Sequence, residues 1–236
     1  MAALPPRYEE ATRKLGAAGL DLLAPFDVRS YNDLVSAHGR LAPLDTVDRT
    51  ACLALLVGNT RAIWPHLRRA VVDDPELLNQ DPVDRYVDKA LRDCVEILEP
   101  QAIVYPSHRK ATHLVSMLHA AEASGFAGRG PAHLAVHPVH GLWFALRAVV
   151  VVDWEPVVAP PELKIDLCSG CEAPCVTALE AAMAEGGDVP YAPGTSAHWR
   201  HWVQVREVCP VGRDARYTDA QIRYHYTYDP KAFGSP

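Results

Sequence analysis

The chain has 236 residues, of which 49% are hydrophobic and 22% are charged, a composition typical of a globular protein with one large core. Its formal net charge of −6 argues against broad, non-specific nucleic-acid binding, which needs a basic surface. No apolar run reaches the roughly 18 residues needed to cross a bilayer, and the charged start, residues 1–14, lacks the apolar segment of a secretory signal. We therefore expect a cytoplasmic protein with neither nucleic acid nor a membrane as a partner.

Hydrophobic periodicity and capping residues predict most of the secondary structure. In chain order the pattern predicts a helix at 5–18, an edge strand and turn at 20–35, a buried strand at 51–57, a helix at 63–72, a helix at 82–98, a short strand at 102–105, and a helix that Ser107 opens and Gly125 ends. The clearest helix is 82–98, because Asp81 suits its N-cap and Pro82 its first position. Strands alternating with helices and local hairpins favour an α+β fold, an α/β sandwich in which helices flank a mostly antiparallel sheet.

Residues 136–152, VHPVHGLWFALRAVVVV, hold an apolar run with one charge in its middle. Read with period two, both faces are apolar, which predicts a central strand covered on both sides. Arg147 interrupts this run, and an unpaired buried charge costs several kcal/mol. Arg147 is therefore expected either to pair with an Asp or Glu elsewhere or to face a polar ligand, and the strand alone leaves both readings open.

The six cysteines do not predict disulfides in a cytosolic protein. Two of them, Cys52 and Cys94, fall at apolar positions and are expected in the core. The other four form a candidate metal or redox site.

Three of these four, Cys168, Cys171 and Cys175, follow one another at CxxCxxxC spacing, and Cys209, followed by a proline, supplies a distant fourth thiol. Four thiolates can bind tetrahedral zinc or complete an iron–sulfur cluster. Three close cysteines with a distant Cys-Pro favour a [4Fe-4S] cluster. Zinc, and reduced thiols that include a redox-active CxxC, are the alternatives.

Several stretches, in the same order, resemble the cobalamin-processing CblC proteins (the MMACHC family), whose fold is related to flavin nitroreductases. They are DLLAPFDVRSYND, ACLALLVGNTRAIWPHL, NQDPVDRYVDKAL, VHPVHGLWFALRAVVVV and HWRHW, and the resemblance continues weakly through ARYTDAQIRYHY. Together they cover most of residues 10–225. Members of that family take up cobalamin in a base-off form and remove its upper axial ligand. Cyanide leaves reductively with a flavin as electron source, and alkyl groups are transferred to glutathione.

The resemblance implies binding roles for residues in the VHPVHGLWFALR and HWR motifs. It places His137 and Trp143 in the corrin pocket, and it implies that Arg147 and Arg200 bind glutathione carboxylates or nearby anionic groups. The remaining members of the HWR motif, His198 and Trp199, are expected to contribute to corrin binding. As alternatives, the tryptophans of HWRHW could cap the core, and His137 could be a hydrogen-bonded residue at the end of a strand.

Two departures from the family pattern bear on the reductant. A tyrosine-rich hairpin that covers the cofactor in a CblC relative is reduced here to GFAGRGPAH, and that relative lacks the CxxCxxxC motif. The motif has a parallel in epoxyqueuosine reductase and reductive dehalogenases, which resemble a cobalamin-binding domain followed by iron–sulfur ligands. A cluster beside the corrin would pass single electrons to the cobalt and could replace the flavin.

These observations predict a CblC-like cobalamin-binding core at 1–158 and a segment at 159–236 that packs the cysteine motif and HWR against it. The expected function is a cobalamin-binding oxidoreductase that reduces the cobalt centre and removes its upper axial ligand. Alternatives are a cobalamin carrier or chaperone without turnover and an FMN-dependent reductase with a structural zinc. The expected partners are cobalamin, glutathione or another thiol, and a cytoplasmic electron donor, with a monomer and a homodimer both open.

Overall fold

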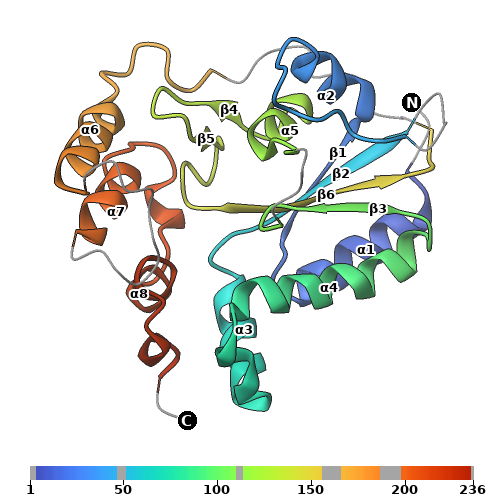
Figure 1. Cartoon of the computed structure of the whole chain (residues 1–236), viewed down its shortest axis with the longest axis horizontal. Coiled ribbons are helices and arrows are strands. Elements are labelled where there is room, and N and C mark those ends of the chain that lie inside the picture. The colour runs from blue at the N-terminus through green and yellow to red at the C-terminus, as the bar shows by residue number, and fades with distance from the viewer. Residues whose placement is uncertain (1–3, 47–51, 110–113, 156–165, 187–197, 235–236) are drawn as a thin grey trace.

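The computed structural model describes residues 4–46, 52–109, 114–155, 166–186 and 198–234 (Figure 1). The helices are α1 (Pro6–Ala17), α2 (Val28–Val35), α3 (Ile63–Asp73), α4 (Pro82–Leu98), α5 (Met117–Ala123), α6 (Pro174–Gly186), α7 (Trp199–Glu207) and α8 (Asp219–Thr227). The strands are β1 (Leu22–Asp27), β2 (Leu53–Asn59), β3 (Ile103–Pro106), β4 (Gly128–Arg129), β5 (Ala135–Val136) and β6 (Ala145–Val152). Short 3-10 helices are η1 (Pro75–Asn79), η2 (Arg213–Ala215) and η3 (Pro230–Phe233).

The four long strands form one sheet in the order β1-β2-β6-β3, and every neighbouring pair is antiparallel. Figure 1 shows α1 and α4 against one face of this sheet, with α2 and α5 against the other. The expected fold, an antiparallel sheet flanked by helices, is confirmed.

Strand β6 lies inside the sheet, between β2 and β3. Its side chains alternate between two cores: Val150 packs with the α1, α3 and α4 side, while Val149 and Val151 pack with the α2 and α5 side. Because both faces are buried, the strand reads as a nearly continuous apolar run. The sequence prediction of a central strand covered on both sides is therefore correct.

A β-bulge in β6 lies at Arg147. Val57 of β2 pairs with Ala148, and the next residue, Gly58, pairs with Leu146, so Arg147 has no opposite residue on β2. A bulge of this kind breaks the regular alternation and redirects a side chain. The guanidinium consequently reaches back toward Asn59 at the end of β2.

Three boundaries differ from those predicted. Strand β6 begins at Ala145, because the residues before it form β5 and a turn closed by mutual backbone hydrogen bonds of His137 and Gly141. The helix expected from Ser107 begins ten residues later, at Met117, where the Ser116 side chain caps it. The turn expected after β1 is helix α2, because Asp27 accepts a hydrogen bond from the Arg29 backbone and serves as its N-cap.

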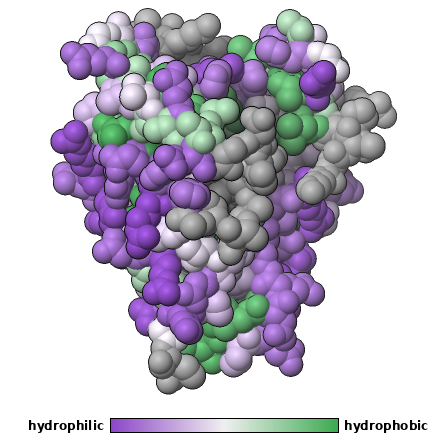
Figure 2. All heavy atoms as spheres, turned by 60° about the vertical axis from the view of Figure 1, so that its left-hand side comes forward, coloured by the Kyte–Doolittle hydropathy of each residue, from purple (hydrophilic) through white to green (hydrophobic). Residues whose placement is uncertain are grey.

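The last third of the chain forms a helical layer, α6 to α8, at the end of the sheet where β6 starts (Figure 1). Helices α6 and α7 pack on each other through Ala182 and Val205, and onto Ala132 of the loop between β4 and β5. Figure 2 shows that the side of the molecule carrying these helices is mostly hydrophilic, with its hydrophobic residues in separate patches. The predicted boundary at 158/159 lies outside the described residues.

No helix in the described part of the chain is both long enough and apolar enough to cross a membrane.

Candidate active site and metal centre

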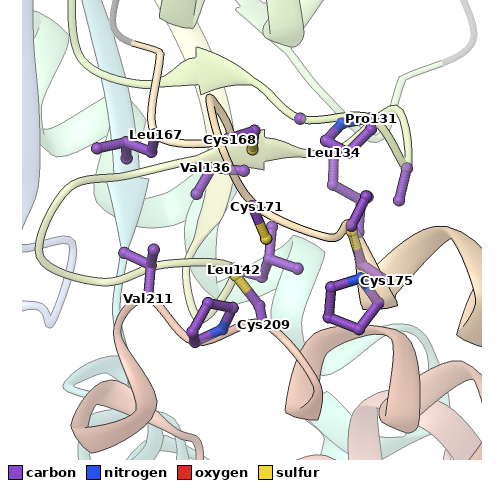
Figure 3. Close-up of a pocket in the computed structure, with 15 residues that line it drawn as sticks. Pro131, Leu134, Val136, Leu142, Leu167, Cys168, Cys171, Cys175, Cys209 and Val211 are labelled. Carbon is purple, nitrogen blue, oxygen red and sulfur yellow. The ribbon is translucent and has the colours of Figure 1, made fainter.

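The four clustered cysteines of the sequence line one pocket between the sheet and the helical layer. Figure 3 shows Cys168 and Cys171 on one loop, Cys175 at the start of α6, and Cys209 on the segment that follows α7. Their sulfur atoms are grouped around the same space although two chain segments supply them. All six cysteines of the chain are free thiols, and the other two, Cys52 and Cys94, are buried core residues as predicted.

The loop that carries the first two cysteines is shaped by local hydrogen bonds. The Asp166 carboxylate accepts hydrogen bonds from the backbone N–H groups of Cys168 (3.0 Å) and Ser169 (2.9 Å). The Cys171 N–H then donates to the Cys168 carbonyl at 3.0 Å, across Gly170 with a φ of +74°. An Asx turn followed by a left-handed glycine is a low-cost way to reverse the chain. It holds two thiols on the same side of a short loop.

The fourth cysteine is positioned by a close contact between two glycines. Gly141, in the turn before β6, and Gly212, shortly after Cys209, both have positive φ. A Cβ at Gly141 would lie 1.9 Å from the Val211 carbonyl oxygen, and a Cβ at Gly212 would lie 2.2 Å from the Gly141 nitrogen. Only glycine permits this approach of the two backbones. The contact ties the Cys209 segment to the turn that leads into the central strand.

The spacing of the sulfurs distinguishes between metal centres. A tetrahedral zinc with bonds of about 2.3 Å would bring its sulfurs to roughly 3.8 Å from one another. In the described residues, the group of three ligand atoms found within 4.8 Å of one another is Glu185, His198 and His201, and no three of the cysteine sulfurs form such a group. A cubane cluster holds its four thiolates farther apart, on the order of 6 Å. The sulfurs are therefore not preset for a tetrahedral zinc, and their spacing leaves room for a larger centre such as a cluster.

The surroundings of the cysteines also suit a cluster. The walls are apolar and include Leu134, Val136, Leu142 and Val211. Burial, with the neighbouring thiols, raises the pKa of Cys168 and of Cys209, and a bound cation would convert these two thiols to thiolates. The Val211 backbone N–H donates to the Cys209 sulfur, and such bonds stabilise a sulfur that carries negative charge.

A second hollow adjoins the cysteine pocket. It holds about 310 Å³, within the range of about 300–1,000 Å³ usual for cofactor sites. Its walls come from the start of β6, the loop before β5, helix α5 and Arg206 of α7. Leu134 and Leu142 line both spaces, so a single layer of side chains separates the cysteines from a ligand in the hollow.

Arg147 is a half-buried cation without a carboxylate partner among the described residues. Its Nε donates to the Asn59 Oδ1 at 2.6 Å, and no described Asp or Glu oxygen lies within 4.0 Å of it. Burial lowers its pKa, while the Tyr217 hydroxyl and Asp84 act in the opposite direction. The reading in which Arg147 pairs with an Asp or Glu is therefore wrong for the described residues.

Around Arg147 lies a buried polar group that sequence reasoning missed. Tyr217 has a hydroxyl, and Gln221 a side-chain oxygen, that are buried and lack a hydrogen-bond partner in the described structure. Burial, and then the charges of Arg147 and Arg206, lower the pKa of His225 to about 3, so this histidine is neutral. Orphaned polar atoms in an electropositive site suit a bound water or an anionic ligand. These residues lie in ARYTDAQIRYHY, the weak end of the resemblance. No motif assigned them a role beside Arg147, because that proximity arises only in the folded chain.

Arg200 lines a separate groove between α7 and α8, together with Trp199. Its guanidinium lies 4.6 Å from the centroid of the Trp199 ring. Two other arginines of this groove are neutralised, because Arg216 binds Glu207 and Arg223 binds Asp229. None of the described carboxylates forms an ion pair with Arg200. Its guanidinium is therefore the one among these three arginines that is suited to binding an anion.

The two arginines of the predicted anion site lie against opposite faces of α8. Arg147 is near Tyr217 and Tyr228, whereas the Arg200 groove is lined by Ile222 and other residues of the opposite face. A shared ligand would have to extend past this helix.

His137 and Trp143 also have defined places. The His137 Nδ1 accepts the N–H groups of Val139 and His140, both at 3.1 Å, and burial together with His140 lowers its pKa to about 4. It is thus a hydrogen-bonded residue at the end of β5, and this leaves its Nε2 to carry the proton. Trp143 is 2% exposed and packs edge-on against Tyr217. Their corrin contacts stay predictions.

The fold and the site together define a nitroreductase-like α+β sandwich with a cysteine centre at one end of its sheet. No protein-family model matches the chain. Curated relatives do: the mouse "cyanocobalamin reductase / alkylcobalamin dealkylase" is 26% identical over 243 residues, covering 94% of this chain and 80% of the relative. The human protein of the same name is 27% identical over 222 residues, covering 86% of this chain and 71% of the relative.

Solved structures give the same fold. A B12-trafficking CblC protein of C. elegans, described as a homologue of human MMACHC, superposes with a TM-score of 0.61 at 18% identity, over 96% of this chain and 95% of that one. Epoxyqueuosine reductase from Bacillus subtilis superposes with a TM-score of 0.54 at 14% identity, over 95% of this chain and 69% of that one. The resemblance predicted from the sequence motifs is confirmed, and the chain is CblC-like.

Proposed function

We propose that this chain is an enzyme that binds cobalamin, reduces its cobalt centre and removes its upper axial ligand. The relatives named cyanocobalamin reductase / alkylcobalamin dealkylase support cobalamin processing. We further propose that a [4Fe-4S] cluster on Cys168, Cys171, Cys175 and Cys209 provides the electrons. The likeness in fold to epoxyqueuosine reductase is consistent with this addition.

One observation carries the proposal. Four cysteines from two chain segments line a pocket whose wall, Leu134 and Leu142, is also the wall of a ligand-sized hollow at the start of β6. A cluster bound by the cysteines would supply single electrons to a cobalamin in that hollow. One electron from the cluster would reduce the cobalt from Co(III) to Co(II), and cyanide would then depart as an anion with both electrons of its bond to cobalt.

The side chains around the hollow would bind the substrate and exclude water. Phe144 and Leu146 offer an apolar wall for the corrin, and Arg206, which also donates to the Leu142 carbonyl, offers a cation to its polar substituents. For alkyl ligands we propose that a thiol such as glutathione accepts the alkyl group, with Arg200 binding a carboxylate of the thiol in its groove. The thiolate would attack the alkyl carbon and leave the bonding electron pair on cobalt.

A single-turnover experiment tests the electron source. Protein purified and reduced without oxygen, then freed of excess reductant, is mixed with cyanocobalamin while both visible spectra are followed. We expect the cluster to become oxidised as free cyanide appears, at one electron per cyanide released. Binding of cobalamin without cyanide release would identify a carrier, and FMN bound to the purified protein as reductant would identify a flavoenzyme; either would refute the cluster role.

Cysteine variants provide the matched comparison. We expect C171S and C209S to lose most bound iron and to slow cyanide release at least tenfold, with cobalamin binding retained. C94S is the control, because Cys94 lies on the buried face of α4 and burial raises the pKa of its thiol to about 11. Equal iron content in C171S and C94S would refute the assignment of the cluster ligands.

A further inference from the structure

A group of metal-binding side chains lies outside the cysteine pocket, where the end of α6 meets the start of α7. It consists of Glu185, His198 and His201, whose ligand atoms lie within 4.8 Å of one another. Glu185 is in the last turn of α6, His198 is the N-cap of α7, and His201 is one turn further along. The His198 Nδ1 lies 3.9 Å from a Glu185 carboxylate oxygen.

We propose that these three residues form a second metal site, one that binds Zn²⁺ and joins α6 to α7. Two imidazoles and a carboxylate are ligands that zinc accepts, and three protein ligands leave a fourth position for water. In a tetrahedral site with bonds of about 2.0–2.1 Å, ligand atoms lie roughly 3.4 Å apart. Small rotations of two exposed side chains, Glu185 and His198, would close the observed spacing.

Two further observations support a cation here. The Nδ1 of His201 is buried, and none of the described residues donates a hydrogen bond to it. Glu185 lies at the C-terminal end of α6, where the partial negative charge of the helix repels a carboxylate and attracts a cation. The partial positive charge at the N-terminus of α7 repels a cation, but the full negative charge of Glu185 is larger.

The consequence of metal binding follows from the position of the site in the chain. Glu185 belongs to α6 and His198 is the N-cap of α7, so one ion would link the two helices directly. It would also fix the first turn of α7, and with it Trp199 and Arg200 of the adjoining groove. We therefore assign the ion a structural role, which does not depend on the proposed function.

Zinc analysis of the intact protein tests the site. Protein prepared without oxygen, with its cysteine centre filled, is equilibrated with Zn²⁺ and freed of unbound metal, and its zinc and iron are counted per chain. We expect E185Q, H198A and H201A to bind about one zinc fewer than the parent, or to bind it at least tenfold more weakly, with unchanged iron. Zinc binding equal to that of the parent in E185Q and H198A, which alter exposed side chains and preserve the fold, would overturn the proposal.

Two controls and one spectrum complete the test. E180Q changes an exposed carboxylate of the same helix, and H66A changes an exposed histidine of α3; both are expected to keep the zinc. Cobalt(II) added in place of zinc should give only weak ligand-field bands. Strong thiolate-to-cobalt absorption would place the ion at the cysteines and overturn the second site.

Discussion

Arg147 brings a charge to the edge of the core, where its Nε donates a hydrogen bond to the Asn59 side-chain oxygen. We predict that R147M lowers the free energy of unfolding by only about 1–2 kcal/mol, the cost of leaving the Asn59 oxygen unsatisfied. Removing one partner of a buried salt bridge would instead cost about 3–5 kcal/mol. Urea denaturation of the two proteins decides between these values. R147K, which keeps the charge, is the matched variant, and a loss above about 3 kcal/mol in R147M would mean that a carboxylate does neutralise Arg147.

His225 makes the stability of the fold depend on pH. Burial, with Arg147 and Arg206, lowers its folded pKa from 6.5 to about 3, so below pH 6.5 the unfolded chain takes up a proton that the folded chain does not. The free energy of unfolding therefore falls as the pH falls, by up to about 1.4 kcal/mol per pH unit from this residue. We predict that H225N flattens the slope measured by urea denaturation between about pH 6.5 and 5.

H66N, which removes an exposed histidine of α3, provides the control substitution against which the slope of H225N is compared. His137, whose pKa burial also lowers, adds a slope of the same sign, so H225N reduces the dependence without abolishing it. If the slope in H225N were as steep as in the parent, His225 of the parent would have to be protonated in the folded state over the same pH range.

At the scale of elements, the turn before β6 and the segment after α7 depend on each other through two glycines. We predict that G141A displaces Cys209 and lowers bound iron at least twofold, because its Cβ would collide with the Val211 carbonyl at 1.9 Å. G170A is the matched variant: it also has a positive φ, in the cysteine loop itself, but a Cβ there meets nothing within 4 Å. It should cost only about 1 kcal/mol of backbone strain and keep its iron, and equal iron in both variants would contradict this role of the contact.

The elements that the sequence predicted well are those whose signals are local. Helix α4 has its predicted bounds because Asp81 and Pro82 specify its start directly. The predicted start of β6 was wrong. The apolar residues before Ala145, such as Leu142, are buried against the cysteine segment and not between the two faces of the sheet. Periodicity reports burial and cannot say which partner provides it.

The candidate site was also predictable from the sequence only where its signals are local. Spacing alone grouped the four cysteines correctly around one pocket. It could not find Tyr217, Gln221 and His225, because their proximity to Arg147 arises from the packing of α8. Nor could it find the bulge that turns Arg147 toward Asn59, since a bulge depends on the register between two strands.

Across the whole molecule, the sheet and the helical layer differ in what holds them together. The sheet is enclosed by two large cores, one on each face, whereas the helical layer has small clusters, and one of them forms the wall of the cysteine pocket. Segments around Gly130, Cys168 and Cys209 meet at this pocket, so a cluster bound there would contribute directly to the stability of the layer.

We therefore predict that removing the cluster loosens one part of the chain selectively. After anaerobic chelation of the iron, amide hydrogen exchange should rise at least tenfold in α6 and α7 and stay unchanged in β2 and in β6 from Ala148 onward. The reason is that these strands lie between two cores that contain none of the four cysteines, and local opening follows the density of buried contacts. The same protein handled in the same way without the chelator, so that it keeps its iron, serves as the reference. Uniform loss of protection in sheet and helices would mean that the molecule unfolds as one cooperative unit, and no change anywhere would mean that the cysteine centre does not hold the helical layer in place.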